Sequence, residues 1–445
     1  MISRASVREF ALYLTVALAV VGAAFCLFYN HPVAFVYLIA EDFHGEYTTS
    51  AAFAAASLLF GQDAWSARRR SRRVISAAMA LAALLIAGEE VSWGHRFWYS
   101  ALGFAEPEVL LTYNLQGELN LHNLESLGLS AHTYRMGAGA LLSWLVLSAW
   151  LLWLHPALAD RLDAAGVPLV PPRLAPLFVA PPLLFLFEPI AKSDEVGELV
   201  LGIAAAAFAL DRASRAGWLA GSRLPALPQA FALCLAAIGV VGFALATVSP
   251  LRIMSARLHS LATRDYPRFG MYEQAETLFA FVDRHHDALE RPDTQLAHAE
   301  MLVAAGRLDE ARAPLAAAVE QARADPAALG GDGLCRMGQL YASLGEPEAA
   351  EAAFSTALVV DQHLLPKAAT ADERAELMWS LARTLRAQGL QDEARTTADR
   401  AEATASSARL RRELRLWSHE LEKADGVAPV STRAGAAAGT PGRPS

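Results

Sequence analysis

Acidic and histidine side chains recur in three stretches of this sequence that border long apolar blocks. The stretches are AGEEVSWGHRFW, QGELNLHNLESL and KSDEVGEL. Residues three or four positions apart share one face of a helix, and the acidic and imidazole residues follow this spacing in the second and third stretches. We therefore expect three helices to direct such groups toward one centre. The residues concerned are Glu89, Glu90, His95, Glu118, His122, Glu125, Asp194, Glu195 and Glu198.

Carboxylates that are brought together with few cations must bind a proton, stay hydrated or bind a metal ion. A mixed set of carboxylate and imidazole ligands suits a divalent transition metal such as zinc better than magnesium. A metal-activated water would attack an ester or amide, with a spare glutamate as general base. We predict Glu89 and Glu90 as catalytic residues, and the predicted metal ligands are Glu118, His122, Glu125, Glu195 and Glu198.

Other polar residues of the same segments could support this site. A structural interpretation stands beside the functional one, because carboxylates at a membrane surface often remain in water and asparagines often cap loops. The sequence also lacks a compact HExxH signature. The supporting residues are Glu41, Asp42, Glu46, Ser92, His95, Arg96, Asn114, Asn120, Asn123 and Asp194.

The composition indicates a membrane half followed by a water-soluble half. Of the 445 residues, 54% are hydrophobic and only 19% are charged, and the apolar blocks end near Thr247. A transmembrane helix needs about 20 largely apolar residues, which predicts an all-α membrane domain of about seven helices over residues 1–250. The predicted spans are 10–30, 47–67, 74–93, 137–154, 174–190, 196–210 and 227–247.

The arginines predict the orientation of these spans. They concentrate at the N-terminus and in every second loop, as in the run from Arg68 to Arg73, and such loops are cytoplasmic in bacterial inner-membrane proteins. The N-terminus is then cytoplasmic and the C-terminal half periplasmic. The acidic and histidine stretches all fall on the periplasmic side. A net charge of −8 gives no general support for a nucleic-acid partner.

Residues 256–423 contain repeats typical of a tetratricopeptide-like α-solenoid. Three copies share a turn glycine followed five residues later by alanine, as in Gly345 and Ala350. Such arrays stack helical pairs into a surface that binds a protein or peptide. Helices that pack only on the membrane domain are the alternative. The tail over 424–445 has few bulky apolar residues and is predicted to be disordered.

The motifs EDFHGEY, GEEVSWGHRF and NLQGELNLHNL resemble, in this order, those of an uncharacterised family of bacterial multi-pass membrane proteins. His95 departs from that pattern, where glutamine is usual, and DFHGE differs in its glycine placement. The architecture is similar, more loosely, to alkaline ceramidase-like membrane hydrolases, although their late paired histidines have no counterpart here. These resemblances imply a helical membrane fold, and the first implies no activity.

Three functions are compatible with these patterns. The first is a metal-dependent hydrolase or transferase that acts on a membrane amphiphile and recruits a protein partner through the repeats. The second is a non-catalytic scaffold for envelope assembly, in which the acidic motifs hold helices and loops together. The third is a cation or proton pathway, which is disfavoured because the acidic groups gather at one membrane face.

Overall fold

The computed structural model describes residues 4–39, 44–91, 132–215, 227–246, 254–285, 293–406, 410–411 and 414–415. The chain divides into two compact units, Met1–Arg291 and Pro292–Ser445. Throughout the described ranges the regular structure is helical and no strand occurs. The prediction of an all-α protein is confirmed.

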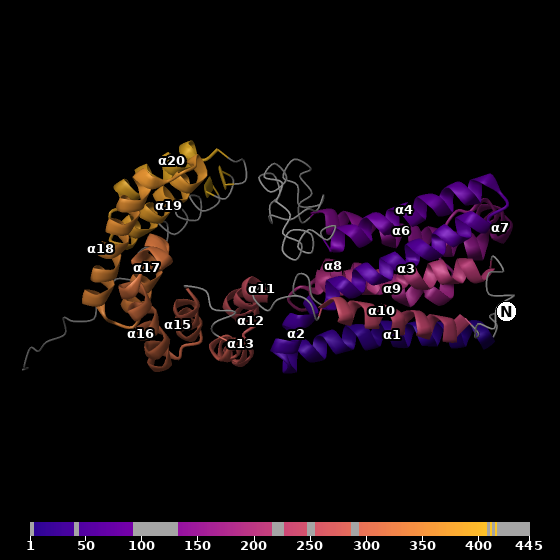
Figure 1. Ribbon diagram of the computed structural model, residues 1–445, viewed down its shortest axis with the longest axis horizontal. Helices are drawn as coiled ribbons and strands as arrows, with labels where there is room; N and C mark the ends of the chain where they lie inside the picture. The colour runs from indigo at the N-terminus through magenta and orange to yellow at the C-terminus, as the bar shows by residue number, and fades with distance from the viewer. Residues whose placement is uncertain are drawn as a thin grey trace, which may run out of the picture. The chain divides into compact units, whose positions relative to one another are not determined.

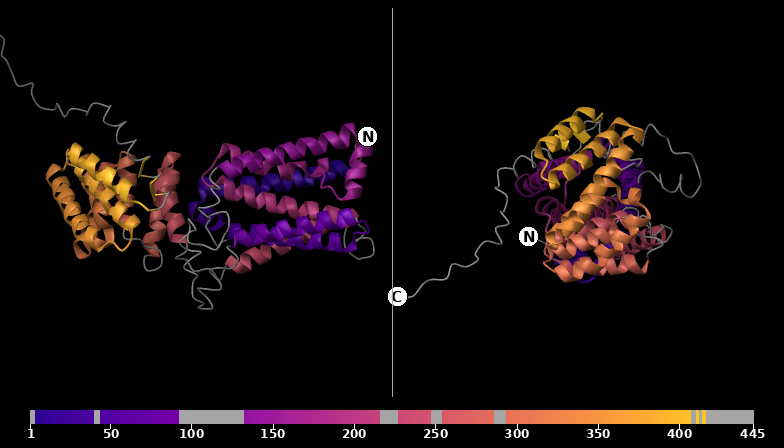
Figure 2. Two further views of the ribbon diagram at one scale, coloured as in Figure 1. Left: turned by 90° about the horizontal axis from the view of Figure 1, so that it is seen from above. Right: turned by 90° about the vertical axis from the view of Figure 1, so that its left-hand side faces the viewer.

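Long helices that run alongside one another form the body of the first unit (Figure 1; Figure 2). Shorter elements connect them or lie at their ends. The long helices are α1 (Arg4–Asn30), α3 (His44–Ser66), α4 (Arg70–Glu90), α6 (His132–Leu154), α9 (Ser193–Arg215) and α10 (Leu227–Ala246). The shorter elements are α2 (Pro32–Ile39), α7 (Pro156–Ala165), η4 (Pro172–Leu174) and α8 (Ala175–Phe187).

Three helical segments in the described part of the chain are long and apolar enough to cross a membrane. They are Val7–Asn30, Arg70–Glu90 and Met136–Leu154. Two shorter apolar segments, Pro172–Phe187 and Ala230–Ala244, accompany them. The predicted blocks 47–67 and 196–210 are also largely helical, in α3 and α9, but these two helices are not among the segments apolar enough to cross a membrane.

Helix α9 is buried along most of its length because α3, α8 and α10 pack against it. A helix that contacts other helices needs small residues for close approach, whereas a helix that faces lipid needs large apolar ones. At Gly202, a Cβ atom would lie 3.1 Å from the Cβ of Ala52 on α3. The alanine-rich sequence of α9 therefore reflects burial within the helical bundle.

A buried ionic network joins several helices at one end of the first unit. Asp63 of α3 is inaccessible to solvent and accepts hydrogen bonds from Arg72 (Nη2 to Oδ1, 2.6 Å) and Ser76 (Oγ to Oδ2, 2.6 Å) of α4. Nη2 of the buried Arg212 on α9 lies 3.5 Å from the same carboxylate and donates to the Gly166 carbonyl at 3.2 Å. The arginine-bearing ends of α4 and α9 thus meet at one end of the bundle.

The chain returns to the first unit after α10. The elements that follow are α11 (Met254–Ser260), the π-helical turn η6 (Leu261–Asp265), α12 (Tyr266–Arg268) and α13 (Tyr272–Arg284). The ring of Tyr266 stacks on Phe28 at 4.8 Å, and its hydroxyl donates to the Phe28 carbonyl at 3.0 Å. Burial raises the pKa of Tyr266, so this hydroxyl stays a donor. The predicted repeat domain of residues 256–423 included most of these elements, whereas they belong to the first compact unit, Met1–Arg291.

The described residues of the second unit form three pairs of consecutive helices over 294–404. Each pair is joined by a short turn with a glycine of positive φ, namely Gly306 (75°), Gly345 (76°) and Gly389 (83°). Glycine adopts this conformation without the steric cost that other residues meet. The pairs are α15 (Thr294–Ala304) with α16 (Leu308–Ala324), α17 (Pro326–Ser343) with α18 (Pro347–Leu364), and α19 (Ala371–Ala387) with α20 (Gln391–Thr404).

Small residues set the spacing within these pairs. A Cβ atom on Gly338 of α17 would lie 2.5 Å from the ring of Phe354 on α18, so only glycine fits there. The alanines that follow each turn glycine, Ala311, Ala350 and Ala394, are all buried. The buried alanines that follow the turns, together with Gly338 in the second pair, thus allow close contact between paired helices.

Candidate functional site

The predicted catalytic segment and part of the predicted ligand segment meet in the first unit. Glu90 ends α4, Glu195 lies in the first turn of α9, and the Glu90 carboxylate is within electrostatic range of both Glu89 and Glu195. Ser50 of α3 donates to the Ala87 carbonyl at 2.7 Å and so fixes this end of α4. Carboxylates from two distant parts of the sequence therefore lie within electrostatic range of one another.

The position of this acidic group in the bundle follows from α4. Arg72 in the first turn of the helix belongs to the ionic network, and Glu90 is its last residue. A helix of 21 residues is about 30 Å long. The acidic group and the arginine network therefore occupy opposite ends of a helix that matches the thickness of a bilayer.

One cation reaches the acidic group from the segment that leaves the bundle. Arg257 of α11 forms an ion pair with Glu195, with 3.4 Å between Nη2 and Oε1. Both side chains are largely shielded from solvent, 11% and 18% exposed respectively. The pair therefore stabilises α11 against the start of α9 and offsets part of the negative charge.

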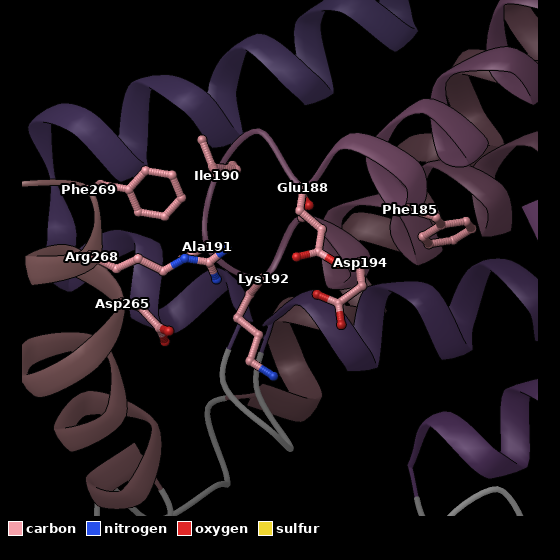
Figure 3. A pocket seen from close by; sticks show the side chains of 10 residues that line it. Phe185, Glu188, Ile190, Ala191, Lys192, Asp194, Asp265, Arg268 and Phe269 are labelled. Atoms are coloured by element: carbon pink, nitrogen blue, oxygen red, sulfur yellow. The ribbon is translucent and has the colours of Figure 1, made fainter. Parts of the chain in front are cut away.

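A pocket of about 270 Å³ lies next to Glu195 along the chain, where α8 ends and α9 begins. One wall is the connection between these helices, and the other is formed by η6 and α12 (Figure 3). Three carboxylates and two cations line it together with apolar groups. The lining residues are Phe185, Glu188, Ile190, Ala191, Lys192, Ser193, Asp194, Asp265, Arg268 and Phe269.

The connection between α8 and α9 has a strained and well-anchored backbone. Glu188 and Lys192 have positive φ angles of 41° and 56°, which are uncommon for residues other than glycine. Ser193 Oγ donates to the Leu184 carbonyl at 3.1 Å, and the Glu188 amide donates to the same oxygen at 3.2 Å. Backbone strain of this kind concentrates at functional sites, where surrounding contacts impose it.

The charged groups of the pocket differ in how they are compensated. Asp265 accepts hydrogen bonds from Arg264 (Nε to Oδ1, 3.1 Å) and Ser260 (Oγ to Oδ2, 3.3 Å). Within the described part of the chain, Glu188, Lys192, Asp194 and Arg268 form no ion pair with each other or with other side chains. Arg268 packs its guanidinium over the Phe269 ring at 5.9 Å. Charges of both signs are thus present and available in one small space.

The remaining predicted site residues divide into two groups. Glu46 lies in the first turn of α3, and Glu198 follows Glu195 by one helical turn on α9; both side chains are partly buried. No group of three or more His, Cys, Asp or Glu arranged to hold a metal ion occurs in the described ranges. Predicted residues outside those ranges are Glu41, Asp42, Ser92, His95, Arg96, Asn114, Glu118, Asn120, His122, Asn123 and Glu125.

Sequence reasoning missed two features of the first unit. Asp63 and Asp211 are both buried and hold the arginine network, and an aspartate inside an apolar block was the signal for Asp63. Arg268 and Asp265 line the pocket although they lie beyond the predicted membrane domain. No local pattern marks these two residues, because only the packing of α12 on the bundle brings them there.

Comparison with known proteins adds no constraint on this site. Neither a protein-family model, a curated protein nor a solved structure matches the chain.

Proposed function

We propose that the first unit is an integral membrane domain whose acidic end acts as a hydrolase or transferase on a membrane amphiphile. The observation that carries this proposal is that Glu90 lies within electrostatic range of Glu195, a carboxylate from a distant part of the sequence. Two carboxylates in one location repel unless a proton, a metal ion or a cationic ligand group lies between them. One carboxylic acid and one carboxylate side by side can serve as general acid and general base.

A metal centre is a finer version of the same proposal. It requires Glu118, His122 and Glu125 to join Glu195 and Glu198, because the described carboxylates alone form no such group. A bound zinc-like ion would supply an activated water at neutral pH. In either version Glu90 handles the proton, and Arg257 holds Glu195 in place.

We further propose that about seven helices cross the bacterial inner membrane, with a cytoplasmic N-terminus and a periplasmic second unit. Arginines from α4 and α9 pair with Asp63, and an arginine from η4 pairs with Asp211 of α9, as expected of segments on the same membrane face. Helices α3 and α9 would cross as buried members of the bundle. The acidic site would then face the periplasm.

For the second unit we propose a tetratricopeptide-like array that binds a protein or peptide. Three consecutive helix pairs with equivalent turn glycines and buried alanines support this assignment. Recruitment of a partner by these repeats would place the partner on the same side of the membrane as the acidic site.

The catalytic proposal is tested by incubating full-length protein with a membrane lipid extract in liposomes. Mass spectrometry then follows loss of parent amphiphiles and appearance of their products. We expect conversion by the wild type and at least a hundredfold lower rate for Glu90→Gln, since removal of a general acid or base typically costs this much. Arg284→Gln, an exposed change on α13, is the control. Identical product profiles for wild type and Glu90→Gln would contradict the proposal.

A scaffold function is the second candidate, and two observations favour it. The ion pair between Arg257 and Glu195 and the buried contact of Tyr266 with Phe28 both use polar groups to hold α11 and α12 on the bundle. If Glu90→Gln lowers the thermal stability of the protein and no lipid conversion is detected in the wild type, the scaffold function is supported.

A further inference from the structure

We infer that the pocket between the α8–α9 connection and α12 binds the headgroup of a zwitterionic lipid that carries a phosphate and a primary ammonium, as in phosphatidylethanolamine. This inference rests on the proposed function, for which it names the class of amphiphile. It is carried by the two signs of charge in the pocket, its size and the apolar surface beside it.

Each wall of the pocket offers a cation. Lys192 belongs to the α8–α9 connection, and Arg268 extends from α12 toward that connection (Figure 3). Neither side chain forms an ion pair with a described residue. A guanidinium binds phosphate oxygens through paired hydrogen bonds, and an ammonium adds a point charge. Together they suit a monoanionic phosphodiester.

The carboxylates suit the other half of such a headgroup. Glu188 and Asp194 both come from the α8–α9 connection and the first turn of α9, and Figure 3 shows their carboxylates in the same part of the pocket. A primary ammonium donates three hydrogen bonds, which two carboxylates can accept. A quaternary ammonium has no donor and is recognised by aromatic rings. Of the two aromatic residues that line the pocket, Phe269, which follows α12, already faces the Arg268 guanidinium. The pocket therefore favours ethanolamine over choline.

The size and surroundings of the pocket place a headgroup inside it and acyl chains outside. Its volume of about 270 Å³ lies just below the range of about 300–1,000 Å³ typical of sites for drug-sized molecules. Next to it, the last two turns of α8 expose Leu183, Leu186 and Phe187. Lipid-facing side chains of this kind would contact the acyl chains of a lipid whose headgroup occupies the pocket.

The strained backbone fits this role. Glu188 and Lys192, which supply one carboxylate and one cation, are the two non-glycine residues with positive φ in the described ranges. Such a conformation persists only where surrounding contacts impose it, and it fixes the direction of the side chain. The hydrogen bonds of Ser193 and Glu188 to the Leu184 carbonyl are contacts of this kind.

Native mass spectrometry of the full-length protein in detergent tests this inference. Phosphatidylethanolamine, phosphatidylcholine and phosphatidylglycerol with identical acyl chains are titrated separately. We expect phosphatidylethanolamine to bind about tenfold more tightly than either of the others, the gain from one added charge-assisted contact. Soluble glycerophosphoethanolamine, added as competitor, distinguishes a free headgroup from an intact lipid. Equal affinities for the three lipids would overturn the inference.

Variants separate the two halves of the headgroup. Arg268→Gln should weaken the binding of phosphatidylethanolamine and of phosphatidylglycerol alike. Asp194→Asn should weaken the binding of phosphatidylethanolamine about tenfold and leave the affinity for phosphatidylglycerol unchanged. Glu188→Gln repeats the second test if Asp194→Asn fails to fold, and Arg284→Gln is the matched control. A preference for phosphatidylethanolamine that survives both carboxylate changes would overturn the assignment.

The outcome is distinguishable from that of the proposed function. Glu90→Gln should keep the lipid preference while it loses conversion, because Glu90 does not line the pocket. If the wild type prefers phosphatidylethanolamine but converts no lipid, the enzymatic function is refuted and the headgroup site stands. If the wild type converts lipid but shows no such preference, the headgroup site is refuted and the enzymatic function stands.

Discussion

Arg257 forms an ion pair with Glu195 (3.4 Å between Nη2 and Oε1) and so connects α11 to the first turn of α9. The pair lies at the end of the bundle where Glu90 is within electrostatic range of Glu195. The same cation thus stabilises the return of the chain to the bundle and limits the repulsion among the carboxylates.

Replacement of this cation should destabilise the first unit. Arg257→Gln removes the cation that pairs with the shielded Glu195, which we expect to lower the free energy of unfolding by about 1–3 kcal/mol. Thermal unfolding of full-length protein in detergent measures the change. Arg284→Gln changes an exposed guanidinium that donates to the Ala280 carbonyl of its own helix, and it should leave the melting temperature within experimental error. A similar melting temperature for Arg257→Gln would show that the ion pair contributes nothing.

The arginine network should tolerate the loss of a pair better than the loss of one partner. Asp63→Asn leaves the buried Arg212 guanidinium uncompensated and should cost about 3–5 kcal/mol of stability. In the double variant Asp63→Asn with Arg212→Gln, the two effects should not add. Melting temperatures of the two single variants and the double variant measure the coupling. Strict additivity would indicate that Asp63 and Arg212 stabilise the protein independently.

The close contact of α17 with α18 depends on a residue without a side chain. Gly338→Ala places a methyl group against the Phe354 ring, which is otherwise 2.5 Å from the Cβ position, and should cost about 1–3 kcal/mol. Hydrogen exchange of full-length protein, followed in peptides from α17 and α18, should show faster exchange in both helices. Ala342→Ser on an exposed position of α17 is the control. Unchanged exchange in Gly338→Ala would contradict the packing described.

Stability of the second unit should fall as the pH rises through a narrow window. Burial raises the pKa of Asp361 from 3.8 to about 6, because its side chain is shielded from solvent. Between about pH 4 and 6 the folded state binds a proton that the unfolded state has released. Stability is therefore greatest at low pH and decreases by up to roughly 3 kcal/mol toward neutral pH.

Asp361→Asn should remove this dependence, because the amide does not titrate. Hydrogen exchange of α18 peptides between pH 4 and pH 7, corrected for the intrinsic rate, measures it in the full-length chain. The wild type should lose protection as the pH rises, and the variant should not. Parallel profiles for the two proteins would contradict the assignment to Asp361.

The sequence was most informative where local chemistry determines structure. Apolar blocks predicted α1, α4 and α6 because helices that face lipid must carry large apolar side chains throughout. Turn glycines predicted the breaks between paired helices, since a positive φ favours glycine. The adjacency of Glu90 and Glu195 was inferred only from their position on one membrane face.

Features that depend on tertiary packing could not be predicted. The burial of Asp63 becomes apparent only when Arg72 and Arg212 from two other helices surround it. Arg268 joins the pocket because Tyr266 stacks on Phe28, a contact between residues at opposite ends of the first unit's sequence. Neither relationship produces a period or a motif in the sequence.

The central claim is that Glu90 and Glu195, from distant segments, form one site. Cysteine cross-linking in native membranes tests it most directly, after Cys26, Cys234 and Cys335 are replaced by serine. We predict that Glu90→Cys with Glu195→Cys becomes linked by a short bifunctional reagent, whereas Arg72→Cys with Glu195→Cys, at opposite ends of the bundle, does not. Equal linking of the two pairs, or none in the first, would contradict the claim.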